Sequence, residues 1–198
     1  KAQAKGISGA ANAIAAGEFA EQFPVDVFQT GSGTSSNMNL NEVIAALVKR
    51  QAKLVVHPNN HVNLGQSSND VVPSSSLLAS ALLLNRLLLP ALKQLRQSVA
   101  KKARQGRGLL KTGRTHLMDA MPMTVEQELS GWQAQLDSAM QRLQDTGKRL
   151  LALPLGGTAV GTGVNADPKM TVLACRILSK NTGLRITPAP NKWELMAA

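Results

Sequence analysis

The sequence predicts a mainly α-helical protein built on long, packed helices. Of its 198 residues, 43% are hydrophobic, only 3% are aromatic, and tyrosine is absent. An aliphatic, leucine-rich core is typical of helix bundles and argues against a β-sandwich. Apolar residues also recur at intervals of three and four, which is the period of a helix with one buried face. A chain of this length can bury a sizeable core in one or two domains.

The amino-terminal part predicts a small, mostly helical region. Residues 1–22 read as a short alanine-rich helix. Asn39 followed by Glu42 resembles a capping pair, so we expect the next helix to begin there and to continue to about Arg50.

The longest predicted element is one helix from Asp70 to Gln105, which the polar cap at residues 67–70 opens. One apolar stripe runs along it: Leu77, Ala81, Leu84, Leu88, Leu92, Leu95 and Val99. Such a helix would span about 54 Å. Pro90 should kink it without ending it, because the stripe continues in phase on both sides. A helix this long needs packing partners along its whole length.

Two further helices have clear start signals. Thr124 with Gln127 forms a capping box, and Asp167 with Pro168 forms a pair of N-cap and first helical residue. The glycine-rich stretch 156–163 lies between them. It lacks the Gly-Lys-Ser/Thr ending of a phosphate-binding loop, so we expect it to turn tightly beside a polar site.

The formal charge of +10 raises the possibility of nucleic-acid binding. The basic residues cluster where the long helix ends: Lys101, Lys102, Arg104, Arg107, Lys111 and Arg114. Cations at that position are also stabilised by the negative end of the helix dipole. The few aromatic residues form no stacking platform for bases. We therefore expect a solvated face or a field that attracts a small dianion, and no nucleic-acid partner.

Compartment signals favour a soluble protein. No apolar run reaches the roughly 18 residues of a membrane span, and the first residues lack the apolar block of a signal peptide. Cys175 is the single cysteine, so it has no partner for an internal disulfide and is expected to pack inside a helix. We expect a cytoplasmic protein without a membrane partner.

Three polar loops indicate one site for an anion: Gly31-Ser32-Gly33-Thr34, Gln66-Ser67-Ser68-Asn69 and Thr112-Gly113-Arg114-Thr115-His116. Each is expected to lead directly into a helix, where unpaired N–H groups bind carboxylates. Taken singly, each loop reads as an ordinary helix cap. Together, with a histidine among them, they favour a site.

His116 is the strongest candidate for acid–base chemistry, because imidazole titrates near neutrality. His57 and His61 have the spacing of helical metal ligands, but Pro58 disfavours a regular helix and no third ligand is evident. We expect no metal.

Five motifs follow one another between residues 23 and 193: the run Gln29-Thr30-Gly31-Ser32-Gly33-Thr34-Ser35-Ser36-Asn37-Met38-Asn39, then Val56-His57-Pro58-Asn59, Gln66-Ser67-Ser68-Asn69-Asp70, Gly113-Arg114-Thr115-His116, and Leu155-Gly156-Gly157-Thr158-Ala159-Val160-Gly161-Thr162-Gly163. Together they resemble class II fumarate hydratase, within the fumarase/aspartase superfamily. The segment Ala189-Pro190-Asn191-Lys192-Trp193-Glu194 is also similar to the family, with Trp for its usual Phe.

The resemblance implies a long-helix bundle of the fumarase/aspartase type, truncated here, with residues 1–66 as a partial N-terminal region and 67–198 as the first part of the central bundle. It implies a homotetramer whose active sites are shared between subunits. The implied reaction is the reversible, cofactor-free hydration of fumarate to L-malate, a step of the tricarboxylic acid cycle, in the cytoplasm or, in a eukaryote, the mitochondrial matrix. His116 would activate water, and the substrate carboxylates would be bound by Ser32, Thr34, Ser67, Ser68, Asn69 and Thr115.

Two departures from the family pattern qualify these expectations. The family's second dicarboxylate site corresponds to His57, Asn59 and Asn60, with Asn60 where the family has Asp and Leu54 where it has a basic residue. The family's Gly-Ser-Ser catalytic loop is absent from these residues, so we expect the chain alone to be an inactive fragment. An aspartase-like ammonia lyase and a non-catalytic structural protein of this fold remain alternatives. His116 argues against an aspartase, because the resemblance implies Gln at this position in aspartases.

Overall fold

The computed structural model describes residues 1–26, 28–29 and 31–197, so Thr30 of the first motif lies outside the described residues. The chain forms two compact units. Unit 1 contains Lys1–Leu78 and Leu151–Ala198, and unit 2 contains Ala79–Leu150. The division into regions 1–66 and 67–198 stays a prediction.

The amino-terminal part of unit 1 is helical, as the sequence predicts. Helix α1 (Ala2–Ala15) and a 3₁₀ turn, η1 (Ala20–Gln22), precede α2 (Thr34–Ala52). The predicted helix start at Asn39 is wrong, because α2 begins at Thr34 and the Asn39 amide donates to the Gln22 carbonyl at 3.1 Å. Helices α1 and α2 share a core of buried aliphatic residues that includes Ala10, Ile44, Leu47, Val48, Val56 and Val62.

The predicted long helix is confirmed, with a local irregularity. A π-helical turn, η2 (Pro58–Val62), comes before α3 (Ser68–Leu83), which continues through a second π segment, η3 (Leu84–Leu88), into α4 (Leu89–Gln105). Pro90 lies in the first turn of α4. Proline lacks an N–H and crowds the carbonyl four residues before it, so the wider π turn accommodates it without ending the helix.

The helical run Ser68–Gln105 is also long and apolar enough to cross a membrane. It contains an 18-residue stretch whose mean hydropathy is 1.5. The core helix of a helical bundle meets the same criterion, so a single such helix is weak support for a membrane span.

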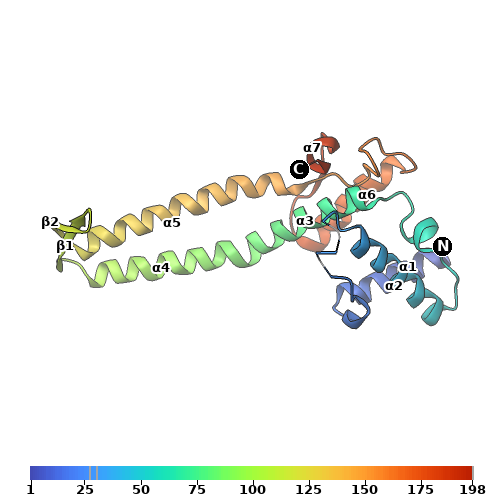
Figure 1. Cartoon of the computed structure of the whole chain (residues 1–198), viewed down its shortest axis with the longest axis horizontal. Helices are drawn as coiled ribbons and strands as arrows, with labels where there is room; N and C mark the ends of the chain where they lie inside the picture. The colour runs from blue at the N-terminus through green and yellow to red at the C-terminus, as the bar shows by residue number, and fades with distance from the viewer. Residues whose placement is uncertain (27, 30, 198) are drawn as a thin grey trace. The chain divides into compact units, whose positions relative to one another are not determined.

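Unit 2 is a helical hairpin. Helices α4 and α5 (Val125–Gly147) run side by side, and the antiparallel strands β1 (Leu110–Thr115) and β2 (Met118–Thr124) join them at one end (Figure 1). The predicted capping box is confirmed, since Thr124 N–H donates to Gln127 Oε1 at 2.8 Å and Gln127 N–H donates to Thr124 Oγ1 at 3.1 Å. The expectation that the His116 loop leads directly into a helix is wrong, because β2 intervenes.

The remaining part of unit 1 surrounds a second core. After the 3₁₀ turn η4 (Lys148–Leu151), strand β3 (Ala152–Leu153) pairs in parallel with β4 (Thr187–Pro188), and α6 (Pro168–Thr182) and α7 (Lys192–Met196) complete the fold. The predicted cap is confirmed by Lys169 N–H, which donates to Asp167 Oδ1 at 2.9 Å. Cys175 packs with Leu153 and Ile186, as expected, and its burial raises the pKa of the thiol.

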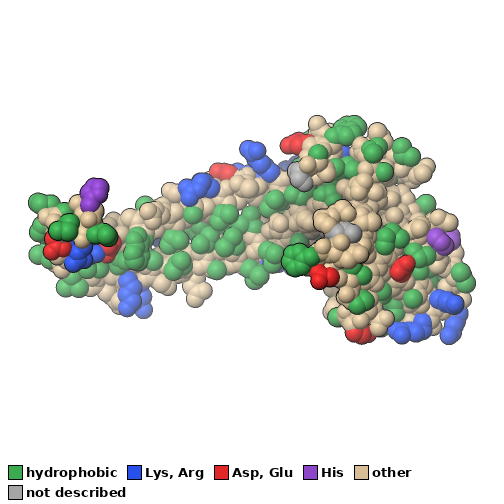
Figure 2. Space-filling view, viewed as in Figure 1, with side chains coloured by type: hydrophobic (Ala, Val, Ile, Leu, Met, Phe, Trp, Pro, Cys, Tyr) green, Lys and Arg blue, Asp and Glu red, His purple; other side chains and the backbone are tan. Residues whose placement is uncertain are grey.

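The surface of unit 2 exposes several large apolar side chains. Figure 2 shows hydrophobic side chains along the two long helices. Large exposed residues include Leu87 at 62%, Leu95 at 51% and Trp132 at 53% of their surface. The basic cluster is partly neutralised, because three of its members pair with carboxylates: Arg107 with Glu126, Lys111 with Glu128 and Arg114 with Asp119. Contiguous exposed apolar area is a feature of surfaces that contact other molecules.

Candidate functional site

The start of α3 carries the predicted residues Ser67, Ser68 and Asn69 in one capped turn. Ser67 Oγ accepts a hydrogen bond from Asn69 N–H at 3.2 Å, and Ser67 N–H donates to Asp70 Oδ1 at 2.9 Å. This reciprocal pairing satisfies backbone donors at both ends of the turn, as in a capping box. The order Ser-x-x-Asp therefore fixes the backbone that presents these side chains.

Ser68 is oriented by a residue from another helix. Asn37 of α2 donates from its side-chain amide to Ser68 Oγ at 2.9 Å, and both residues are buried. A hydroxyl that accepts one hydrogen bond still has a proton to donate. The contact with Asn37 thus leaves Ser68 able to donate its O–H to an anion.

The loop before α2 approaches α3 closely. Gly33 has φ +69°, and a β-carbon there would lie 2.9 Å from Cγ1 of Val72. Only glycine combines this left-handed backbone with so close an approach. The loop places the hydroxyls of Ser32 and Thr34 3.0 Å apart.

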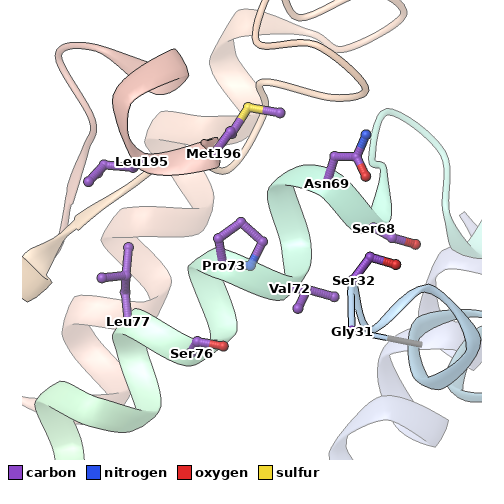
Figure 3. Close-up of a pocket in the computed structure, with 10 residues that line it drawn as sticks. All are labelled: Gly31, Ser32, Ser68, Asn69, Val72, Pro73, Ser76, Leu77, Leu195 and Met196. Atoms are coloured by element: carbon purple, nitrogen blue, oxygen red, sulfur yellow. The ribbon is translucent and has the colours of Figure 1, made fainter. Parts of the chain in front are cut away.

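These elements border a hollow of about 380 Å³ in unit 1. Figure 3 shows Ser32 beside Ser68 and Asn69 at one end, the α3 residues Val72, Pro73 and Leu77 along one wall, and Leu195 and Met196 of α7 opposite. The described residues that line it carry no charge, so an anion would be bound by hydroxyl and amide donors and by the helix start. The structure therefore brings Ser32, Ser68 and Asn69 together at the hollow. Thr34 is hydrogen-bonded to Ser32, and Ser67 lines another groove beside the same turn.

The glycine-rich loop is tied to the same turn, which the sequence analysis did not foresee. Asp70 Oδ2 accepts hydrogen bonds from Gly156 N–H at 2.8 Å and from Thr158 N–H at 2.9 Å, and Asn69 donates from its amide to the Ala159 carbonyl at 2.8 Å. The predicted tight turning is thus confirmed, and the loop lies beside the polar turn at the start of α3. The Ser-x-x-Asp order was visible in the sequence, but nothing local indicates partners 86 and 88 residues away.

Thr115 and His116 belong to unit 2, so within one chain they are assigned to a different unit from the other predicted residues. His116 and Leu117 form the two-residue turn between β1 and β2, with φ of +49° and +64°. Turns of this kind favour Asn-Gly, and a left-handed backbone costs other residues about 1–2 kcal/mol each. Both side chains are exposed. Strain at an exposed histidine supports a functional role.

The residues of the predicted second site only partly converge. Asn59 and Asn60 border a shallow groove of about 620 Å³ that Asn63, Ser67, Thr158 and Asn165 also line. His57 instead accepts hydrogen bonds at Nδ1 from the N–H groups of Asn59 and Asn60, both at 3.2 Å. The described residues of the groove include no cation, so a dicarboxylate would lack a charged partner there.

His57 and His61 are hydrogen-bonded to each other within one turn. His57 N–H donates to His61 Nδ1 at 2.8 Å across the π turn. In residues 1–26, 28–29 and 31–197, no group of three or more histidine, cysteine or carboxylate side chains is placed to hold a metal ion.

Comparison with known proteins places the chain among lyases. The family model described as Lyase matches residues 1–198. The chain is 56% identical to class II fumarate hydratase of Xylella fastidiosa strain Temecula1, over all of this chain and 42% of that protein. It is 46% identical to class II fumarate hydratase of Thermus aquaticus, over 98% of this chain and 43% of that protein. The chain thus spans less than half the length of these relatives.

Two solved structures share the fold. The crystal structure of fumarate lyase:delta crystallin from Brucella melitensis bound to cobalt matches 99% of this chain and 44% of that one, with a TM-score of 0.91 and 37% identity. The class II fumarase of Schistosoma mansoni matches 98% of this chain and 45% of that one, with a TM-score of 0.83 and 34% identity. The predicted helical-bundle fold of the fumarase type is confirmed.

Proposed function

Because this chain belongs to the lyase family, we propose that the complete protein catalyses the reversible hydration of fumarate to L-malate. The 56% identity to a class II fumarate hydratase supports this assignment. The observation that carries it is the meeting of Ser32, Ser68 and Asn69 at one hollow beside the start of α3.

The hollow suits a small dicarboxylate in its chemistry. Hydroxyl and amide donors held by Asn37, Ala159 and the α3 cap are fixed before a ligand arrives. In the reaction, hydroxyl from water adds to one alkene carbon and a proton to the other. The intermediate between these steps is a dianionic aci-carboxylate, which donors fixed in advance stabilise more than they stabilise the substrate. Ser32, Thr34, Ser67, Ser68 and Asn69 are the proposed carboxylate ligands.

His116 is the proposed base that removes a proton from water, with Thr115 as a further carboxylate ligand. Within unit 2 the chain is helical from Ala79 to Gln105, a distance of about 40 Å along the helix, so the hairpin lies far from the first residue of the unit. A second copy of the chain is the proposed source of the hairpin at each site, because the family resemblance implies active sites shared between subunits. We propose a homotetramer with shared active sites.

The surface of unit 2 supports assembly. Besides the helix residues, the hairpin exposes Leu110 at 76%, Met118 at 70% and Leu117 at 95% of their surface. A two-stranded hairpin with so little buried area is marginally stable alone. Contact with partner copies would bury these residues.

The remaining parts of the proposal follow the family. The enzyme would need no cofactor or metal, would act in the tricarboxylic acid cycle in the cytoplasm or the mitochondrial matrix, and would have no nucleic-acid or membrane partner. His57, Asn59 and Asn60 would form a second dicarboxylate site, weakened by the uncharged lining of the groove.

An absorbance assay on the complete protein tests the function. Fumarate should be consumed and L-malate should yield fumarate without added metal. Turnover of L-aspartate with neither of these reactions would favour an ammonia lyase. Loss of all three reactions in a folded, assembled protein would favour a structural role.

A further inference from the structure

We propose that Asp70 is a positioning residue that holds the carboxylate-binding turn and the glycine-rich loop in one fixed geometry. This inference rests on the proposed function. Asp70 itself is fully buried, so it acts on the substrate through the residues that it holds.

The carboxylate divides its two oxygens between two parts of the fold. Oδ1 accepts the N–H of Ser67 at 2.9 Å, and Oδ2 accepts the N–H groups of Gly156 and Thr158 at 2.8 and 2.9 Å. Only a carboxylate has two acceptor oxygens and no competing donor. One side chain therefore fixes the start of α3 relative to a loop some 86 residues later.

The loop in turn acts on Asn69. The Ala159 carbonyl accepts from the Asn69 amide at 2.8 Å, so movement of the loop would turn the side chain proposed to bind the substrate. The loop is also held from its other side, because Lys192 of α7 donates to the Gly156 carbonyl at 3.1 Å. Helix α7 carries Leu195 and Met196, which line the same hollow.

Packing alone does not account for a charge at this position. A buried carboxylate loses its hydration, and apolar residues of similar volume often serve stability equally well. Beside a site for a dianion, the negative charge of Asp70 also opposes ligand binding. The directional bonds to three backbone N–H groups are the gain that offsets both costs.

The test replaces Asp70 with asparagine in the complete protein. In Asp70→Asn, an NH₂ group takes the place of one acceptor oxygen and faces backbone N–H donors. We expect the dissociation constant of succinate, an unreactive dicarboxylate, to rise at least about tenfold, and KM for fumarate to rise by a similar factor. Both are measured well below the unfolding temperature of the variant, so that only folded protein contributes.

Asp167→Asn is the matched control. Asp167 also accepts a backbone N–H, at the start of α6, but it does not line the hollow. This control should lower the unfolding temperature slightly and leave succinate affinity unchanged. A purely structural role for buried Asp70 would lower the unfolding temperature further but leave succinate affinity unchanged; that result, or tighter succinate binding, would overturn the inference.

A second variant covers the case in which Asp70→Asn does not fold. Lys192→Met loosens the same loop from its other side, and we expect a smaller rise, about threefold, in the succinate dissociation constant. Unchanged affinity in this variant would overturn the inference equally. If the unsubstituted protein neither binds succinate nor converts fumarate, the proposed function itself fails, which is a separate outcome.

Discussion

The candidate functional residues of the two units differ in how firmly the surrounding structure holds them. In unit 1, Ser67, Ser68 and Asn69 are held by partners from α2, α3 and the glycine-rich loop. In unit 2, His116 lies in an exposed turn with a left-handed backbone. Hydrogen bonds fix the candidate residues of unit 1, whereas the hairpin of unit 2 has left-handed backbone and exposed apolar side chains. This difference supports the proposal that a second copy of the chain contacts the hairpin.

Removing the imidazole should have the largest effect. In the complete protein, His116→Asn is expected to lower kcat by about a hundredfold or more, because general base catalysis typically contributes this much. Succinate affinity and the circular dichroism spectrum should stay unchanged. His61→Asn, at another exposed histidine, is the control. An unaltered kcat in His116→Asn would remove this residue from the mechanism.

Changing the loop of unit 1 should affect binding and stability together. A methyl group in Gly33→Ala would press on Val72 and occupy a left-handed backbone, so we expect a loss of about 1–3 kcal/mol in the free energy of unfolding. KM for fumarate should rise with little change in kcat. Urea denaturation and steady-state kinetics measure these quantities. Gly9→Ala is the control, because a β-carbon there would have open space, and it should be neutral or stabilising. Equal losses of stability in the two variants would contradict the account.

The second site should give the smallest effect. Leu54→Arg supplies the basic residue that the family has at this position, and we expect a rise of a few-fold, about 1 kcal/mol or less, in the affinity of a second succinate. Isothermal titration measures both the affinity and the stoichiometry. Leu54 is half-buried, and the predicted gain should fall at high salt, because salt screens the attraction between the introduced charge and succinate. A gain of the same size at high salt would show that charge is not its cause.

Local signals in the sequence predicted much of the fold. The capping pairs Thr124 with Gln127 and Asp167 with Pro168 are confirmed because their hydrogen bonds are local. The helix start predicted from Asn39 and Glu42 was wrong, because the Asn39 side chain donates to the Gln22 carbonyl instead of capping a helix. The β1–β2 hairpin was missed because His116-Leu117 lacks the Asn-Gly signal of a two-residue turn.

The candidate site was predictable only in part. The residue types at Ser32, Ser68 and Asn69 indicated a polar anion site, and the hollow brings them together. The hydrogen bonds of Asp70 to Gly156 and Thr158 depend on the packing of distant segments. No local pattern encodes that packing, so this part of the site required the structure.

Complementation between two inactive variants tests the central claim most directly. The complete protein is prepared as His116→Asn and as Ser68→Ala, and the two are unfolded together, refolded as a mixture and assayed with L-malate. If each site combines the loops of one copy with the hairpin of another, random mixing should restore about one quarter of the original activity in a symmetric oligomer. Activity no greater than that of the two variants refolded separately would contradict the account, because it would place both groups of residues in the same chain.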